Sequence, residues 1–368
     1  MQMITYRKPN FRKNFVFFLS GLILLGISLF IQGCNTPVNP TKEQLGKMTE
    51  SANQQTSVAS PTEVLPSATP IPDQKKIIIV RTPDANPGIL EIFESALRQL
   101  PAEIYTIEET DNLTPATVPE DADLIIFPNL PPDLTQYTQQ FPQKQFVVLS
   151  LQPQTDPNVW TIQYDIGFQP FLAGYFVGVT ANDWRGAGLL PSDSPLYGAA
   201  IAETFTNGMK LFCGRCQSYG PPYVEFPLTV LLPEDSAPEA WIAALDQIQD
   251  SFPNTFYVSE AALSLPLLQK LSEKQAAVIT AEKPPEGWNG NWLGSVQINL
   301  AGALNDIVRR SANGEQAGAV IPELQIETGI QQSLFNQGKK LYLNKLYADL
   351  ISGLVSPYDP VPPASFEK

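Results

Sequence analysis

The sequence has no histidine. Histidine is the commonest general base and the commonest transition-metal ligand, so its absence excludes Ser-His-Asp and Cys-His catalysis and removes the usual metal sites. Catalysis by paired carboxylates remains open in principle, but it needs two converging acidic side chains with at least one raised pKa. The sequence shows no motif of that kind, and it therefore predicts no catalytic residue, no cofactor and no metal.

Cysteine is scarce too, with three residues in the whole chain. Two of them, Cys213 and Cys216, share the motif Phe-Cys-Gly-Arg-Cys. Outside the cytoplasm such a pair favours a disulfide. A redox-active pair is the alternative, although the order of elements around the motif is not thioredoxin-like. Zinc would need two further ligands, and the chain has no second cysteine pair.

Basic clusters are missing after the N-terminal region. The chain has a formal charge of −14 and a pI near 4.5. Without a basic patch, binding to a phosphate backbone is not expected, so the sequence predicts no nucleic-acid partner. The negative charge favours solubility and indicates little else.

The first 33 residues have the parts of an export signal: a basic opening, a charge-free apolar stretch at residues 15–31, and the ending Ile-Gln-Gly-Cys34. A cysteine directly after a small residue is typical of bacterial lipoproteins, in which the thiol is lipidated before cleavage, although Gln32 is unusual at its position. The sequence therefore predicts a signal peptide at residues 1–33 and lipidation of Cys34. An uncleaved transmembrane anchor is the alternative.

Residues 34–74 have almost no large apolar side chains and are rich in Pro, Thr, Ser, Gln and Asn. Such a stretch cannot bury enough apolar surface to offset its ordering entropy, so it is predicted to be a disordered tether. A coil of about 40 residues spans roughly 35 Å on average. The rest of the chain would thus stand off a membrane that holds the lipid anchor.

The remaining residues alternate between short apolar strands and amphipathic helices. Strands are predicted at 77–80, 103–108, 123–127, 145–149, 160–164, 187–190, 226–232, 255–259, 276–280, 292–298 and 319–325, with helices between most of them. This alternation predicts an α/β fold with parallel sheets covered on both faces. The number of strand–helix units is too large for a single sheet of ordinary size. We expect a monomer with two doubly wound lobes joined by a hinge: residues 75–164 and 290–322 in lobe I, and residues 165–289 and 323–358 in lobe II.

The stretch at residues 164–184 is the most informative part of the sequence. It leaves a strand through an acidic turn and enters a helix in which Gly174 and Gly178 lie one turn apart, which predicts close packing against another backbone. An ordinary core helix would also fit. The run Phe171-Leu-Ala-Gly174-Tyr resembles the basic membrane lipoprotein family, the solute-binding proteins that include purine nucleoside receptors. Residues 204–210, Gly-Ser-Val at 294–296 and Ile-Ser-Gly at 351–353 add to the resemblance by their order and spacing.

The resemblance implies the type I periplasmic binding protein-like fold, solute binding outside the cytoplasm and delivery to an ABC permease. Two departures concern the nucleoside site. The loop after the first strand, residues 81–87, lacks the family's Asp-rich pattern, and the segment at 278–292 lacks its Gly-Val-Asp. Glu282 is the residue that would replace the missing aspartate in holding a pair of sugar hydroxyls.

Candidate ligand-binding residues come from the loops at strand ends and from the start of the central helix, since ligands of such sheets bind outside the carboxyl ends of the strands. They are Asp84, Asn86, Asp165, Phe168, Gln169, Asp193, Glu282, Trp288 and Trp292. Structural roles compete with this interpretation: Asp165 can cap its turn, Asp193 can be an N-cap, and the two tryptophans can cover the hinge. The acidic run at residues 234–239 is predicted to be a solvated helix start.

The sequence thus predicts a lipid-anchored solute-binding protein on the extracytoplasmic face of the cell membrane, with a nucleoside as the leading ligand and an ABC permease as partner. An orphan lipoprotein on the same fold, acting as a ligand sensor or docking to a membrane partner, is the alternative. A carboxylate-based hydrolase is a third hypothesis.

Overall fold

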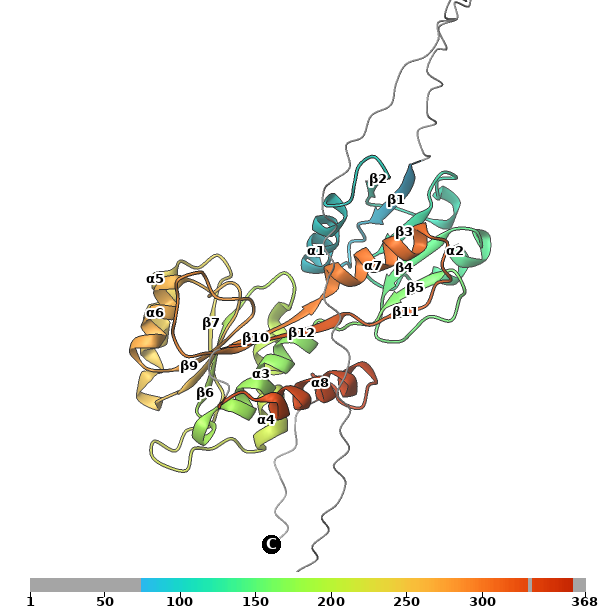
Figure 1. Cartoon of the computed structure of the whole chain (residues 1–368). Helices are drawn as coiled ribbons and strands as arrows, with labels where there is room; N and C mark the ends of the chain where they lie inside the picture. Colours follow the sequence, from blue (N-terminus) through green and yellow to red (C-terminus); the bar gives the residue numbers. More distant parts are fainter. Residues whose placement is uncertain (1–73, 330–332, 360–368) are drawn as a thin grey trace, which may run out of the picture. The chain divides into compact units, whose positions relative to one another are not determined.

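The computed structural model describes residues 74–329 and 333–359 (Figure 1), which belong to one compact unit, Thr69–Lys368. The predicted signal peptide, the lipidated Cys34 and the tether up to residue 73 lie outside the described residues. Among the residues described, no helix combines the length and the apolar composition needed to cross a bilayer.

The first sheet has six parallel strands in the order β11-β5-β4-β3-β1-β2. They are β1 Lys75–Val80, β2 Tyr105–Thr110, β3 Leu124–Phe127, β4 Gln145–Leu149, β5 Val159–Ile162 and β11 Ala319–Val320. Alternate residues of β1 face opposite sides: Ile77 and Ile79 pack with α1 (Pro87–Arg98) and α7 (Leu300–Ala312), whereas Ile78 and Val80 pack with α2 (Leu134–Gln140). Burial on both faces explains why these strands are continuously apolar.

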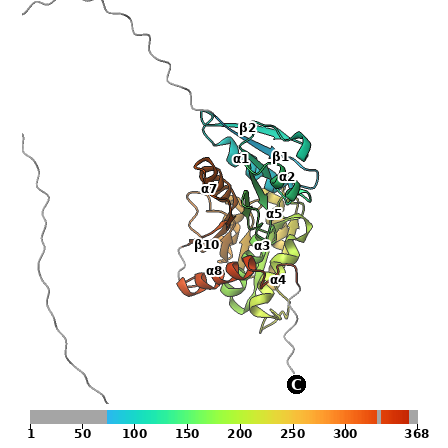
Figure 2. The same cartoon turned by 90° about the vertical axis from the view of Figure 1, so that its right-hand side faces the viewer.

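The second sheet has the order β12-β10-β9-β8-β6-β7. Its strands are β6 Gly186–Pro191, β7 Leu228–Leu232, β8 Thr255–Val258, β9 Ala277–Thr280, β10 Trp292–Asn299 and β12 Glu323–Thr328, of which β12 runs antiparallel to β10. Two helices, α5 (Pro238–Gln247) and α6 (Leu265–Glu273), cover one face. On the other face lie α3 (Phe168–Thr180), α4 (Ile201–Cys213) and α8 (Gln337–Ile351), and both views show α8 beside α3 (Figure 1, Figure 2).

Both sheets repeat one topology. The orders β2-β1-β3-β4-β5 and β7-β6-β8-β9-β10 are the same doubly wound arrangement, and one further strand is added at the β5 and β10 edges. Among the described residues the chain passes from one sheet to the other three times: between β5 and α3, between β10 and α7, and between β11 and β12. The fold class is therefore the predicted one, an α/β protein with two doubly wound, mostly parallel lobes joined by three crossings.

The second lobe crossing, between β10 and α7, differs in place from the sequence expectation. Residues from 290 on were assigned to the first lobe, but β10 pairs with β9 and β12 of the second sheet, and the chain changes lobe only at Asn299 and Leu300. The predicted single strand at 319–325 is split into β11 and β12 because Pro322, which has no N–H to donate, falls between them. The short helix α2 was not predicted.

The close packing predicted for Gly174 is confirmed. A Cβ atom on Gly174 would overlap the carbonyl oxygen of Phe205 in α4, and one on Gly208 would overlap the carbonyl oxygen of Phe171 in α3. The two helices therefore touch backbone to backbone through glycines contributed by both. This contact fixes α3, whose first turn carries Gln169.

Candidate ligand-binding site

A cavity of about 770 Å³ lies at the carboxyl ends of β6, β7, β8 and β9. The segments that follow these strands form one side, and α1 and α7 of the first lobe form the other. A volume of this size suits a small organic molecule. Its position agrees with the general rule that ligands bind outside the carboxyl ends of parallel strands.

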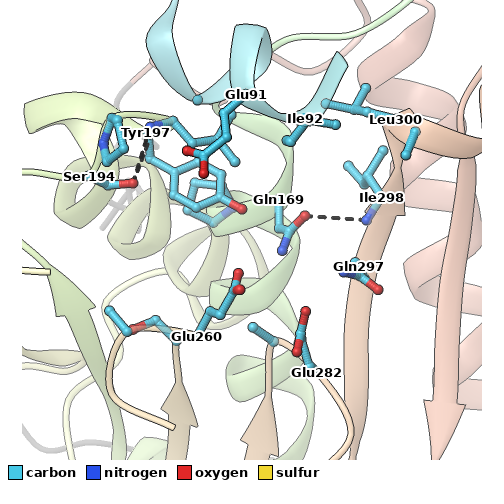
Figure 3. Close-up of a pocket in the computed structure, with 18 of the residues that line it drawn as sticks. Glu91, Ile92, Gln169, Ser194, Tyr197, Glu260, Glu282, Gln297, Ile298 and Leu300 are labelled. Carbon is cyan, nitrogen blue, oxygen red and sulfur yellow. Dashed lines mark hydrogen bonds between the residues drawn. The ribbon is translucent and has the colours of Figure 1, made fainter. Parts of the chain in front are cut away.

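Four glutamates line the cavity: Glu91 of α1, and Glu234, Glu260 and Glu282, which follow β7, β8 and β9. Figure 3 shows the carboxylates of Glu260 and Glu282 pointing into the same space, with Glu91 reaching toward it from α1 on the other side. The described residues that line the cavity include no lysine or arginine. None of the four glutamates forms an ion pair within the described part of the chain.

The environment makes ionisation of two of these glutamates less favourable. Burial raises the pKa of Glu260 above its ordinary value, and repulsion from Glu282, Glu234 and Glu91 raises it further. Burial likewise raises the pKa of Glu234, with contributions from Asp193 and Glu91. The site thus concentrates negative charge without supplying its own counter-charge.

Three tyrosines, Tyr164, Tyr197 and Tyr257, add aromatic surface and hydroxyl groups to the cavity. Burial is the first cause that raises the pKa of each, so all three are neutral at physiological pH. The side-chain oxygen of Gln169, which is buried, accepts a hydrogen bond from the backbone N–H of Ile298 at 3.3 Å (Figure 3). This bond ties the start of α3 to β10 across the floor of the cavity.

Two polar atoms at the cavity have no hydrogen-bond partner among the residues that the structure describes. The Oγ of Ser259 and the Oδ1 of Asn305 are both buried and make no hydrogen bond within the described residues. A buried polar atom without a partner costs about 1–3 kcal/mol. A ligand that donates hydrogen bonds would satisfy both atoms, so the cavity offers such a ligand two acceptors.

Two of the nine residues predicted from the sequence line this cavity, namely Gln169 and Glu282. They come from distant parts of the chain and lie in the same close-up (Figure 3).

The other predicted residues with acidic or amide side chains are engaged elsewhere. The carboxylate of Asp84 accepts a hydrogen bond from Asn129, and that of Asp193 accepts one from the backbone N–H of Glu234. Asp165 accepts from the N–H of Gly167 and so closes its own turn. Asn86 caps α1 by accepting from the N–H of Ile89, one turn away from the cavity-lining Glu91.

The predicted aromatic residues serve packing. Phe168 is buried between Tyr164 and Tyr347. Trp288 packs on α6 and donates its indole N–H to the Leu268 carbonyl and the Ser272 hydroxyl. Trp292 donates its indole N–H to Thr280. None of the three lines the cavity.

Sequence reasoning missed Glu91, Glu234, Glu260, Ser259 and Asn305. A usable signal existed for Ser259 and Glu260, since both directly follow a predicted apolar strand and strand ends are where ligands bind. Glu234 was interpreted as part of a solvated helix start, although it follows β7 in the same way. Glu91 and Asn305 lie within helices, and their position at the cavity depends on the packing of the two lobes.

The cysteine pair lies away from the cavity. Cys213 and Cys216 are joined by a disulfide at the end of α4, with their Cα atoms 5.1 Å apart. The described part of the chain contains no group of three or more acidic or cysteine side chains close enough to hold a metal ion.

No protein-family model matches the chain, and no curated protein matches it in sequence. Several solved structures are similar to it. A 5-methylthioribose transporter solute-binding protein from Thermotoga lettingae is 15% identical, with a TM-score of 0.45 over 76% of this chain and 95% of that one. An ABC transporter solute-binding protein from Conexibacter woesei is 14% identical, with a TM-score of 0.42 over 77% of this chain and 98% of that one. A LacI family transcription regulator from Clostridium acetobutylicum is 12% identical, with a TM-score of 0.41 over 69% of this chain and 100% of that one. These similarities do not show membership of the basic membrane lipoprotein family.

Proposed function

We propose that the protein is a solute-binding protein that holds one small polar molecule in the cavity between α1, α7 and the carboxyl ends of β6–β9. The observation that carries this proposal is the pair of unpartnered buried atoms, Ser259 Oγ and Asn305 Oδ1, in a cavity of about 770 Å³. The two atoms come from different lobes, so a ligand that bonds to both would also hold the lobes together. Closure on a solute would then be a hinge motion.

The N-terminal sequence supports a place of action outside the cytoplasm. An export signal ending at Cys34 supports lipidation and an extracytoplasmic position on the membrane, and the tether after it would let the lobes reach a membrane partner. The resemblance of residues 171–174 to the basic membrane lipoprotein family supports an ABC permease as that partner. An orphan lipoprotein that senses the solute would bind it equally well, and loss of solute uptake in a strain without the protein separates the two.

A purine nucleoside is the first neutral candidate for the solute, because the resemblance to the basic membrane lipoprotein family implies this ligand. Hydroxyl groups of a ribose can donate to Glu282 and Ser259, and the tyrosines offer aromatic faces to a base. Thermal shift and tryptophan fluorescence of the full chain in detergent, with a panel of nucleosides, sugars and amines, test binding directly. A ligand at a hundredfold excess over Kd stabilises the folded state by about 2.7 kcal/mol.

Ser259→Ala is the sharpest variant for this test. The hydroxyl makes no hydrogen bond within the described residues, so its loss should not destabilise the unliganded protein, whereas it should weaken binding of the solute by about two- to tenfold. Ser264→Ala is the matched control, because the Ser264 hydroxyl is also buried and unpartnered but does not line the cavity. The proposed site would be contradicted if both variants changed the solute affinity equally, or if Ser259→Ala left it unchanged.

A carboxylate-based hydrolase is a second candidate because one observation favours it. Glu260, with its raised pKa, faces Glu282, and a raised-pKa acid beside a second carboxylate is the arrangement that general acid catalysis uses. Turnover of a glycoside or nucleoside panel, lost in Glu260→Gln, would establish that candidate. Binding without turnover supports the solute-binding proposal.

A further inference from the structure

The charge of the cavity says more about the solute than its size does. Glu91, Glu234, Glu260 and Glu282 surround one space, and no lysine or arginine among the described residues lines it. Burial raises the pKa of Glu260, and repulsion from the other three glutamates raises it further. A neutral solute would leave that repulsion in place. A cation would remove it and gain charge-assisted hydrogen bonds to the carboxylates.

The hydrogen-bonding groups of the cavity also favour a cationic solute. Ionised carboxylates only accept, and the unpartnered Oδ1 of Asn305 is also an acceptor. Ser259, which is 5% exposed, lines the cavity with a hydroxyl that no protein group engages. These acceptors favour a ligand that is rich in donors, such as an ammonium group with its three N–H bonds.

The carboxylates are spread out rather than gathered around one point. Glu91 comes from α1, whereas Glu260 and Glu282 end neighbouring strands of the other lobe (Figure 3). The described residues contain no cluster tight enough to hold a metal ion. Apolar side chains also line the cavity, among them Ile92, Leu196 and Ile298. Separated negative groups in a cavity that also offers apolar surface fit an alkyl chain with an amine at each end.

The missing basic residues exclude another class of cation. An amino acid such as ornithine or lysine carries a carboxylate, which would need a positive partner, and the described lining residues supply none. Beside four glutamates such a carboxylate would be repelled. We therefore infer that the solute is an aliphatic di- or polyamine without a carboxylate; this inference rests on the proposed solute-binding function and narrows it.

Three compounds of the same chain length test the inference on the full-length protein in neutral detergent. Putrescine has two amines, L-ornithine is putrescine with an added carboxylate, and butane-1,4-diol replaces both amines by hydroxyls. Calorimetry at fixed ionic strength should show saturable binding of putrescine or its longer relative spermidine. Ornithine should bind at least about tenfold more weakly, and the diol should not bind at millimolar concentration.

Variants separate the site from the general attraction of a protein with a charge of −14 for any cation. Glu260→Gln and Glu282→Gln should each reduce the affinity for putrescine by about tenfold or more, because each removes a charge-assisted hydrogen bond. Glu286→Gln removes the same charge from the same segment outside the cavity lining and should leave the affinity unchanged. Equal losses in all three variants would overturn the inference.

The remaining outcomes distinguish this inference from the proposed function. No response to putrescine or spermidine, or equal affinity for ornithine, overturns the amine inference. If a nucleoside or sugar then binds and Ser259→Ala weakens it, solute binding stands with a neutral ligand. If a panel of neutral and cationic solutes gives no binding that depends on Ser259, the proposed function fails as well.

Discussion

Glu260 shows at the scale of one residue how the site trades stability for binding. The pKa of Glu260 lies above its ordinary value of 4.5 because of burial and the neighbouring Glu282, Glu234 and Glu91. At pH values between the ordinary pKa and the raised pKa, the folded protein binds more protons than the unfolded chain. The free energy of unfolding therefore decreases as the pH rises through this range. The unliganded protein should therefore gain stability when this residue is neutralised at neutral pH.

The corresponding prediction compares Glu260→Gln with the wild type at two pH values. At pH 7 the variant should have the higher melting temperature, because it removes a carboxylate whose ionisation is disfavoured by partial burial and by the neighbouring glutamates. At pH 4, where both proteins are uncharged at this position for the most part, the difference should disappear. Glu286→Gln, outside the cavity, should show no such dependence. A variant that is less stable than the wild type at pH 7 would contradict this account of Glu260.

The candidate residues also show why the site was only partly predictable. Trp288 and Trp292 stand in a Gly- and Asn-rich segment, which in sequence resembles an exposed aromatic binding loop. Their indole N–H groups are taken up by Leu268, Ser272 and Thr280, and such contacts depend on how α6 and β9 pack. Glu282 was predictable because a strand end alone places it at the cavity.

At the scale of elements, the contact between α3 and α4 holds the floor of the site. A Cβ atom on Gly174 would overlap the backbone carbonyl of Phe205, and backbone atoms cannot move aside as a flexible side chain can. Gly174→Ala should therefore destabilise the protein by about 1–3 kcal/mol, the usual effect of overpacking. Urea denaturation followed by circular dichroism measures this change.

Gly178→Ala provides the matched control one turn further along α3. A Cβ atom there would lie 3.2 Å from the carbonyl oxygen of Met209, a tight but tolerable approach. Alanine is the better helix former by about 1 kcal/mol, which should offset the crowding and leave the stability nearly unchanged. Equal destabilisation by the two variants would mean that the helices do not meet most closely at Gly174.

The elements themselves were largely readable from the sequence. Strands such as β3, β4 and β9 are short apolar runs buried on both faces, and their pattern is local. The place of β10 was not readable, because its pairing with β12 joins residues from two sides of α7. The split between β11 and β12 was signalled by Pro322, which the prediction of one strand overlooked.

At the scale of the whole described molecule, a contact between the lobes borders the cavity. The side-chain amide of Asn86 donates to the Leu196 carbonyl at 2.9 Å, and the backbone N–H of Gly88 donates to the Pro195 carbonyl at 3.3 Å. Gly88, Pro195 and Leu196 all line the cavity. Asn86, a predicted ligand residue, therefore has a different role here: it joins the first turn of α1 to the other lobe.

Asn86→Ser should weaken this contact without damaging the helix. Serine is as good an N-cap as asparagine, so it can still accept from the N–H of Ile89, but it has no amide to donate to Leu196. Losing one hydrogen bond of about 0.5–1.5 kcal/mol should shift the protein toward open conformers and reduce solute affinity about two- to tenfold. Solution X-ray scattering should show a larger radius of gyration without solute, and calorimetry should show the weaker binding.

The control is Asn336→Ser at the start of α8. Asn336 caps its own helix by accepting from the N–H of Lys339, so this substitution should affect neither measurement. If Asn86→Ser binds as tightly as the wild type, the contact does not contribute to closure, and the affinity then comes from the cavity residues alone.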